Sequence, residues 1–495
     1  MIRSWYYHTM KPIRTRIAPS PTGQDLHIGN AYTALINYVV AKKAEGQFLI
    51  RIEDTDRTRL VEGSEERIIQ SLKWLGIPHN EGPDIGGKFA PYRQSERLPL
   101  YKKYAEELVE KGHAYYCFCT SERLEAMRKK QEEEHKPPMY DGLCKTIPLA
   151  EAKKRVEKGE KYVIRLNVPD TGVTTFHDLI RGDISFENTL IDDQVLLKSD
   201  GYPTYHLGVV VDDHIMEITH IIRGEEWIPS TPKHILLFQF FGWELPQFAH
   251  VSVLRNPDKS KLSKRKNPVW VSDYKAKGYL PEAMKNYFAL MAWSHPEGKE
   301  FFTVEEMIQV FHIEDIQTTA PVFDQEKLRW MNGEYLRKMN DTRLSTCIID
   351  YLSSRPPSRD LIDEGRFRVK PGMTMDRDRL MRVIPLIRDR MKTLAEFESL
   401  AGFFFEQPKV FERPLNKEII TTLKDILTDC EWNHDVMEKA IRNTGEKAGL
   451  KAKDMFMELR LAVTGKTVGP PLLESMEILG KEETLARLST NYQSI

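Results

Sequence analysis

The segment from Arg14 to Ile52 constrains the fold of this chain more than any other. Arg14–Ile17 is a short strand-like run, a turn-rich loop follows at Pro19–Gly23, and Phe48–Ile52 is a compact apolar run that predicts a second strand. Between the two strands we expect a helix that ends near Gly46. The residues that recur at i, i+3, i+4 and i+7, and so lie on one face of this helix, are Ala31, Ala34, Leu35 and Tyr38. Such a βαβ unit opens a doubly wound, Rossmann-like α/β domain, whose ligands bind at the carboxyl ends of the strands. The loop 18–27 and Glu53 are expected there.

The rest of the chain divides into regions of different pattern. A single core stops growing at roughly 250 to 300 residues, so a chain of 495 residues is expected to hold several domains. We predict a first domain over residues 13–111 and 194–250, with an α/β insertion at 112–193. Its parallel sheet is expected to resume at Val195–Leu197 and to continue through His220–Arg223. Residues 251–338 form a third region, and 339–495 is expected to be all-helical.

Composition places the chain among folded proteins that are not embedded in a membrane. Apolar residues make up 41% and charged ones 29%, and no apolar run reaches the roughly 20 residues that a membrane-spanning helix needs. The start of the sequence lacks the pattern of a secretory signal, so we expect a cytoplasmic protein with no membrane partner; Met10 is a second candidate initiator. Five cysteines do not make a disulfide framework, and Cys347 and Cys430 are expected to be isolated thiols. A net charge of -1 leaves an RNA partner open.

The loop before the predicted helix carries the first chemical motif. The run 18–23 reads APSPTG, and three residues later a histidine and a glycine stand at the helix entrance, as His27-Ile28-Gly29-Asn30. Small residues and the N–H groups of a helix N-terminus let phosphates approach the backbone, and the histidine adds a hydrogen-bond donor. Alone, a His-x-Gly sequence indicates only an ordinary strand-to-helix turn.

A second motif stands more than two hundred residues later. The run 259–266, KSKLSKRK, contains lysines at 261 and 264 and is interrupted by Leu262 and Ser263. A run of basic residues usually indicates a solvated surface. A loop of this composition can also fold over a triphosphate and neutralise the charge on departing pyrophosphate. The pairing of the two motifs favours the second interpretation.

These two motifs resemble the signatures of class I aminoacyl-tRNA synthetases. Nine stretches, which extend over about the first 335 residues, are similar to bacterial glutamyl-tRNA synthetases: TRIAPSPTG, RIEDTDRTR, PYRQSERLPLY, LLKSDGYPTYHL, VVDDH, RGEEW, STPKH, LRNPDKSKLSKRK and FDQEKLRWMNGEYL. The resemblance implies an enzyme that attaches glutamate to tRNA(Glu) through a glutamyl-adenylate, and we expect it to be a monomer. The insertion would then bind the acceptor stem, residues 251–338 would contact the stem and carry the lysine loop, and 339–495 would bind the anticodon.

The resemblance also implies roles for particular residues. His27, Lys261 and Lys264 would be catalytic, and ATP with Mg²⁺ would be bound by Pro19, His27, Gly29, Asn30, Glu226, Trp227, Leu254 and Lys264. Glutamate needs cations for its two carboxylates and an anion for its ammonium; the implied residues are Arg16, Ala18, Ser20, Glu53, Tyr205 and Arg223. For Arg223 the alternative is a structural ion pair with Glu225 or Glu226.

The insertion contains a possible zinc site. Cys117, Cys119, Tyr140 and Cys144 resemble a variant ligand set of this family, and zinc prefers four ligands among which thiolates are common. His135 is a nearby substitute for the tyrosine. The alternative is a small cluster of reduced, packed cysteines.

In the helical half, Arg390 resembles the arginine with which family members reject tRNA(Gln). An arginine only donates hydrogen bonds, so it matches the acceptors of cytosine and opposes the donors of guanine. The alternatives are a phosphate contact, a pair with Asp389, or an exchange of roles with Arg388. If Arg390 does not discriminate between the two tRNAs, tRNA(Gln) would also be charged.

The other possible functions are those of a glutaminyl enzyme, which would be expected to end in β-barrels, of a shortened relative that lacks the anticodon half, and of a non-catalytic tRNA-binding protein.

Overall fold

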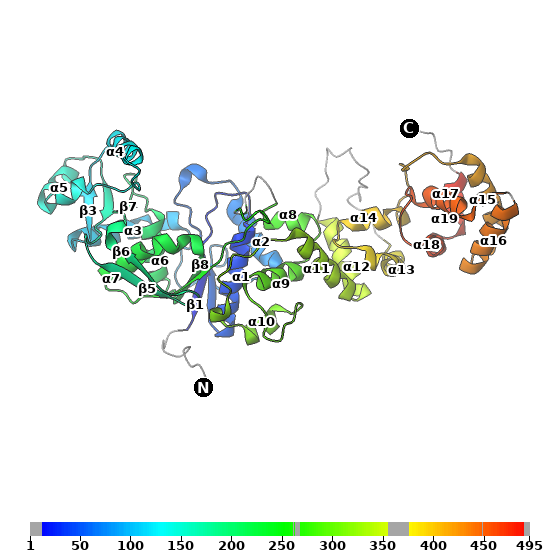
Figure 1. Cartoon of the computed structure of the whole chain (residues 1–495), viewed down its shortest axis with the longest axis horizontal. Coiled ribbons are helices and arrows are strands. Elements are labelled where there is room, and N and C mark those ends of the chain that lie inside the picture. Colours follow the sequence, from blue (N-terminus) through cyan, green and yellow to red (C-terminus); the bar gives the residue numbers. More distant parts are fainter. Residues whose placement is uncertain (1–11, 261, 263–267, 355–375, 448, 490–495) are drawn as a thin grey trace. The chain divides into compact units, whose positions relative to one another are not determined.

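The computed structural model describes residues 12–260, 262, 268–354, 376–447 and 449–489. Two compact units make up the chain (Figure 1). Unit 1 comprises Met1–Asp273 and Met284–Asp324, and unit 2 comprises Tyr274–Ala283 and Gln325–Ile495. The sequence predicts a boundary after residue 338, some fourteen residues beyond the division between the units; the four-part division by function stays a prediction.

The βαβ unit predicted from the sequence opens unit 1. Strand β1 (Arg14–Ile17) pairs in parallel with β2 (Gln47–Ile50), with Arg16 opposite Leu49. Between them lies α1 (Ile28–Lys43), which buries apolar residues along nearly its whole length because it is covered on several sides. The helix ends three residues earlier than expected, and the second strand ends at Ile50 rather than Ile52.

A second pair of parallel strands completes the ligand-binding edge. Strand β8 (His220–Gly224) pairs with β9 (Gln247–Val251), and helices α6 (Tyr205–Ile215) and α7 (Thr231–Phe241) flank β8 in sequence. The backbone N–H of Thr219 donates to the carbonyl of Arg14, which ties the start of β8 to β1. The parallel strand expected at 220–223 is therefore present.

The prediction that Val195–Leu197 belongs to the parallel sheet is wrong. This strand, β7, pairs antiparallel with β4 (Val163–Leu166), which in turn pairs antiparallel with β3 (Ala114–Cys117). A run of three apolar residues fits a buried strand of either sheet, so periodicity could not decide between them. The parallel core resumes only at β8.

The remaining strands form a hairpin beside β9. Strands β5 (Val173–Asp178) and β6 (Gly182–Glu187) are antiparallel, and β5 also meets β9 in parallel at Asp178 and Phe248. The other helices assigned wholly to unit 1 are α2 (Ser64–Leu75), α3 (Leu98–Glu110), α4 (Ser121–Glu133), α5 (Leu149–Glu157) and α10 (Val304–Val310). Helices α8 (Val271–Ala276) and α9 (Pro281–Ala292) contribute residues to both units.

Unit 2 contains helices joined by loops, and no strand, in its described residues, as the sequence predicted. Its helices, coloured from yellow-green to red in Figure 1, are α11 (Gln325–Lys338), α12 (Asp341–Ser353), α13 (Arg377–Ile387), α14 (Glu396–Ala401), α15 (Lys417–Asp429), α16 (His434–Lys447), α17 (Ala452–Thr464), α18 (Leu472–Leu479) and α19 (Lys481–Ser489). Leucine and isoleucine at helical spacing, such as Ile419, Leu423 and Leu427 in α15, are buried in its core. Over the residues described, we find no helix long and apolar enough to cross a membrane.

Close approach of two backbones at Gly46 predicts a strong effect on stability. A Cβ atom at Gly46 would lie 2.0 Å from the carbonyl oxygen of Ile13, which accepts a hydrogen bond from Gln47. Gly46→Ala must therefore shift β2 against β1. We expect it to lower the free energy of unfolding by about 3 kcal/mol, the upper end for an overpacked site, as measured by urea denaturation. Glu45→Ala, in the same turn but exposed, should change it by less than about 0.5 kcal/mol; equal effects would contradict the explanation.

Candidate active site

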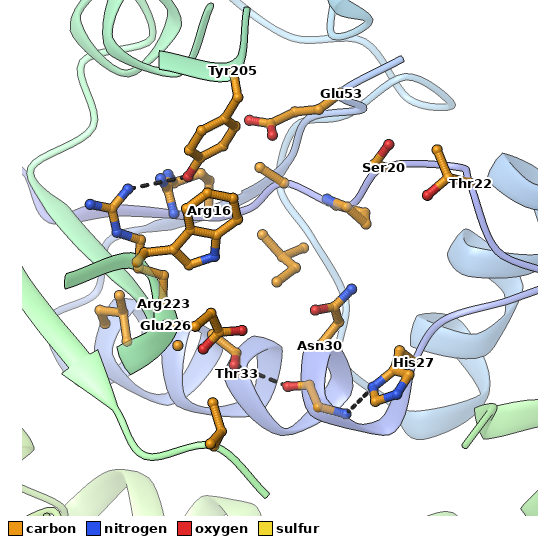
Figure 2. A pocket seen from close by; sticks show the side chains of 18 of the residues that line it. Arg16, Ser20, Thr22, His27, Asn30, Thr33, Glu53, Tyr205, Arg223 and Glu226 are labelled. Atoms are coloured by element: carbon orange, nitrogen blue, oxygen red, sulfur yellow. Dashed lines mark hydrogen bonds between the residues drawn. The ribbon is translucent and has the colours of Figure 1, made fainter. Parts of the chain in front are cut away.

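The predicted ligand-binding residues of unit 1 surround one cavity of about 850 Å³. Its walls come from the end of β1 and the loop after it, the start of α1, the end of β8 and the end of β9 (Figure 2). The sequence-predicted residues that line it are Arg16, Ala18, Pro19, Ser20, His27, Gly29, Asn30, Glu53, Tyr205, Arg223, Glu226, Trp227 and Leu254. The structure thus brings together residues that lie more than two hundred positions apart, while the role of each stays a prediction.

One end of the cavity is the N-terminus of α1. His27 caps the helix, and its Nδ1 accepts a hydrogen bond from the backbone N–H of Gly29 at 3.0 Å. In the neutral imidazole this bond places the proton on Nε2, the nitrogen that then acts as a donor. Gly29 has little room for a side chain, because a Cβ there would lie 3.2 Å from Nδ1 of His27. A helix N-terminus with a histidine donor is suited to bind phosphate.

The segment after the lysine run is fixed beside this helix start. The N–H of Ile28 donates to the carbonyl of Val269, and the N–H of Val271 donates to the carbonyl of Leu26. Trp270, between them, meets the ring of His27 edge-on at 6.0 Å. Within the run itself Leu262 is buried and lines the cavity, whereas Lys261 and Lys264 lie outside the described residues.

The other end of the cavity is held by buried ion pairs. Nε and NH2 of Arg16 both donate to the carboxylate of Asp213 at 3.0 Å. Asp213 also accepts from Arg51 at 2.7 Å, and Arg51 donates to Glu53 at 3.1 Å. Although burial opposes ionisation of Asp213, the two guanidinium groups outweigh it and lower the pKa of its carboxyl. Arg16 is therefore both neutralised and oriented.

Glu53 has a different environment from Asp213, and its pKa is shifted in the opposite direction. It faces Tyr205 across the cavity in Figure 2, and its carboxylate forms an ion pair with Arg51. Burial raises the pKa of Glu53 from 4.5 to about 7, against the attraction of Arg51 and Arg16. A cation placed in the cavity beside Glu53 would stabilise its ionised form.

Arg223 forms no ion pair with any carboxylate that the structure describes. Its guanidinium donates to Tyr205 Oη at 3.2 Å and Thr231 Oγ1 at 2.9 Å, and two imidazole nitrogens complete its shell. Glu225 pairs instead with Arg181 at 2.7 Å, and Glu226 is exposed. The alternative of a structural ion pair with Glu225 or Glu226 is therefore wrong, and Arg223 brings a buried, uncompensated positive charge to the cavity wall.

The three cysteines of the insertion form a cluster away from the cavity. The sulfurs of Cys117, Cys119 and Cys144 all lie within 4.8 Å of one another. Tyr140 Oη lies 3.2 Å from Cys119 Sγ and 3.6 Å from Cys117 Sγ. The described ligand atoms that gather here do not include those of His135, which is exposed. Burial raises the pKa of the Cys119 thiol to about 11, and the neighbouring thiols add to the effect.

Arg390 and Arg388 differ in their surroundings in unit 2. Arg388 forms an ion pair with Asp341. Arg390 is exposed and makes no hydrogen bond or ion pair with a residue that the structure describes, Asp389 included. Of the two arginines, Arg390 is thus the one whose donors are open to a partner.

Comparison with known proteins places the chain in a family. Residues 12–330 match the model of "tRNA synthetases class I (E and Q), catalytic domain", and residues 360–491 match that of an "Anticodon binding domain". A glutamate–tRNA ligase of Thermus thermophilus is 48% identical over 96% of this chain and 98% of that protein. One of Acinetobacter baumannii is 43% identical over 96% of this chain and 92% of that protein.

Solved structures agree with the sequence comparison. The crystal structure of a glutamate tRNA ligase from Elizabethkingia meningosepticum, in complex with its amino acid, is 34% identical, covers 97% of this chain and 98% of that chain, and has a TM-score of 0.80. A parallel α/β domain that carries both signature motifs, with His27 of the first and Leu262 of the second lining one cavity, defines a class I aminoacyl-tRNA synthetase. The chain belongs to the branch of that class denoted E and Q, for glutamate and glutamine. The resemblance to bacterial glutamyl-tRNA synthetases is confirmed.

Several residues that shape the site were not singled out from the sequence. Asp213 orients Arg16 and is itself bound by Arg51, and His234 and His250 contact Arg223. Asp213 follows an apolar helical run in the stretch VVDDH, and His234 ends the stretch STPKH. Charged residues at positions that periodicity predicts to be buried are a usable signal, because such groups need partners; the identity of the partners required the structure.

The raised pKa of Glu53 predicts how stability depends on pH. The folded protein binds this proton more tightly than the unfolded chain, so the stabilisation is present below pH 4.5 and is lost as the pH rises through about 7. Glu53→Gln should therefore gain about 2 to 3 kcal/mol in unfolding free energy relative to the wild-type chain between pH 5 and pH 8. Urea denaturation at the two pH values measures this.

The exposed Glu45 provides the control for that experiment. Glu45→Gln should leave the difference between pH 5 and pH 8 as it is in the wild-type chain. A Glu53→Gln difference that does not change with pH would show that Glu53 is ionised at both pH values.

Proposed function

We propose that this protein attaches L-glutamate to tRNA(Glu), forming glutamyl-adenylate from glutamate and ATP and releasing AMP and pyrophosphate. The observation that carries this proposal is the charge pattern of the cavity. Arg16 and Arg223 face the same space from β1 and β8, and Glu53 faces it from the end of β2. Glutamate carries two carboxylates and one ammonium group. Its carboxylates would meet the unpaired Arg223 and the N–H groups of Arg16, which is also paired with Asp213, and its ammonium would meet Glu53.

The phosphate-binding end supports the same assignment. In the first step the α-carboxylate oxygen of glutamate attacks the α-phosphorus of ATP, and the bond to pyrophosphate breaks. The α1 N-terminus and His27 Nε2 would stabilise negative charge that develops on the phosphate oxygens. Trp227, Leu254 and Glu226 would border the adenosine, and ATP would enter with Mg²⁺ bound to its phosphates. Lys261 and Lys264 are assigned to the departing pyrophosphate by resemblance alone.

The second step transfers the activated glutamate to tRNA. A ribose hydroxyl of the terminal adenosine attacks the carbonyl carbon of the mixed anhydride, and AMP leaves. Neither step needs a nucleophilic side chain, so positioning and electrostatic stabilisation supply the catalysis. The cytoplasm is the compartment in which we expect the enzyme to act.

The direct test is ATP-dependent charging of purified tRNA with labelled glutamate and, in parallel, with labelled glutamine. We expect glutamate to be attached to tRNA(Glu) and glutamine to be attached to neither tRNA. Charging with glutamine would identify the glutaminyl activity instead. Binding of tRNA without charging by either amino acid would identify a non-catalytic binding protein.

The choice between tRNA(Glu) and tRNA(Gln) is assigned to Arg390. The anticodons differ at their third base, where cytosine offers acceptors and guanine offers donors. Arg390→Gln supplies both a donor and an acceptor, so it should raise charging of tRNA(Gln) relative to tRNA(Glu) by roughly tenfold, within the range of about 1 to 3 kcal/mol for one base contact. The ratio of kcat/KM for the two tRNAs measures this change.

Arg388→Gln is the matched control for Arg390. It removes an arginine two positions away that is already paired with Asp341, and it should leave the ratio for the two tRNAs unaltered. If Arg390→Gln lowers both activities alike and weakens their salt dependence, Arg390 contacts a phosphate.

We also propose that the cysteine cluster holds a structural zinc ion. Zinc–sulfur bonds of about 2.3 Å separate the sulfurs of a tetrahedral site by roughly 3.8 Å, and Cys119 Sγ lies 3.6 Å from Cys144 Sγ. Three sulfurs and a phenol oxygen gather within reach of one ion, and thiolates are common zinc ligands, so a cation suits the donor set. Tyr140 Oη completes it in place of His135. When bound, the ion would crosslink β3 to the turn that contains Cys144.

The zinc proposal predicts a metal content of about one ion per chain. Cys144→Ser should lower the zinc found by elemental analysis to well below half of that amount, since zinc binds serine more weakly than thiolate. Cys430→Ser, at a buried cysteine of unit 2, should leave it unchanged. Fully active protein that contains no zinc would leave the cluster as packed thiols.

A further inference from the structure

Arg223 is held by four neutral groups, two of which are imidazoles. Its Nε donates to Nε2 of His250 at 3.1 Å, and its NH1 meets Nδ1 of His234 at 3.1 Å. Tyr205 and Thr231 supply the other two acceptors. The guanidinium has five N–H groups, and these four bonds leave one N–H of NH2 for a ligand.

The bond to His250 fixes how that ring is protonated. A guanidinium only donates, so Nε2 of His250 must accept and carries no proton. The proton is then on Nδ1, which donates to Oδ2 of Asp178 at 2.6 Å. Asp178 is fully buried, and its carboxylate also accepts from the backbone N–H groups of Ile180, Arg181 and His250. The negative charge of Asp178 therefore stands one imidazole ring away from Arg223.

His234, on α7, also accepts from Arg223, but its second ring nitrogen meets another imidazole instead of a carboxylate. Nδ1 accepts from Arg223, so its proton is on Nε2, which donates to Nδ1 of His206 at 3.0 Å. Burial lowers the pKa of His234 well below its ordinary value, and it lowers that of His250 to about 4. Both rings are uncharged at neutral pH, and protonating either one would turn its acceptor nitrogen into a donor that faces Arg223.

The contrast with Arg16 shows what these neutral acceptors achieve. Arg16 is oriented by the carboxylate of Asp213, which also cancels most of its charge. Arg223 has its orientation fixed just as firmly, but by groups without charge. Carboxylates that act on Arg223 from farther away include Asp213, which is itself paired with Arg16 and Arg51, while Arg16 repels it.

We infer that His234 and His250 are positioning residues for substrate binding, which orient Arg223 through neutral acceptors so that its full positive charge is available to a carboxylate of the substrate. This inference rests on the proposed function, in which that carboxylate belongs to glutamate. If a carboxylate replaced either imidazole, it would orient Arg223 equally well but would neutralise the charge of the guanidinium. Substitutions at His234 or His250 can therefore change the charge available from Arg223 while its orientation is kept, whereas a substitution of Arg223 itself would remove both.

A pair of nearly isosteric variants tests this separation. In His234→Asn the amide oxygen replaces Nδ1 as a neutral acceptor, and in His234→Asp a carboxylate oxygen replaces it. We expect KM for glutamate to be at least tenfold higher in the Asp variant than in the Asn variant, with KM for ATP changed less than twofold between them. His250→Gln and His250→Glu form a second pair, with the same expected order, that decides the result if one His234 variant fails to fold.

His220, on the same strand as Arg223, provides the matched control. It bonds to Thr219 rather than to Arg223, so His220→Asn and His220→Asp should have the same KM for glutamate. If the Asn and Asp variants at 234, and the Gln and Glu variants at 250, show equal KM values for glutamate, the inference is overturned. A parallel rise in KM for glutamate and ATP would overturn it too, since it would indicate a general disturbance of the site. Failure of the wild-type protein to charge glutamate would instead reject the proposed function.

Discussion

The buried ion pairs centred on Asp213 are the interaction on which the cavity depends. This one carboxylate from α6 binds Arg16 of β1 and Arg51, which follows β2, so it ties together three segments that are distant in sequence. Removing one partner would leave a charge buried and uncompensated, which costs about 3 to 5 kcal/mol. The same contacts that hold the sheet edge together therefore also aim the side chains that face the ligand.

The local pattern was sufficient to predict the first βαβ unit, because the apolar runs of both strands and the helical spacing of α1 are each clear. It failed at Val195–Leu197, where three apolar residues fit either sheet and only pairing with β4 decides. The expected topology brings His27, at the start of α1, and Glu53, after β2, to one cavity, because the loop after β1 and the end of β2 lie at the same edge of the sheet. Nothing in the sequence indicated that Asp213 would neutralise Arg16 while Arg223 would be left with imidazoles, because side-chain partners are a property of the packed chain.

The two ends of the cavity use different physical means. At the α1 end, the helix N-terminus and a capping histidine offer fixed dipoles, which bind anions without bringing a net charge. At the other end, Arg223 brings a net charge whose solvation has been replaced by neutral hydrogen-bond acceptors. A phosphate that brings its own counterions suits the α1 end, and a single carboxylate suits the end at Arg223.

An uncompensated guanidinium also changes how a wrong substrate would be rejected. A neutral amide of the same size as a carboxylate could fill the space beside Arg223, but it would exclude water while leaving the charge unpaired. Selectivity would then come from an energetic penalty on the mismatched complex rather than from a weaker attraction, and such penalties discriminate more strongly than a lost contact does. The same unpaired charge lowers the free energy of unfolding of the ligand-free protein, since Arg223 remains buried whenever the site is empty.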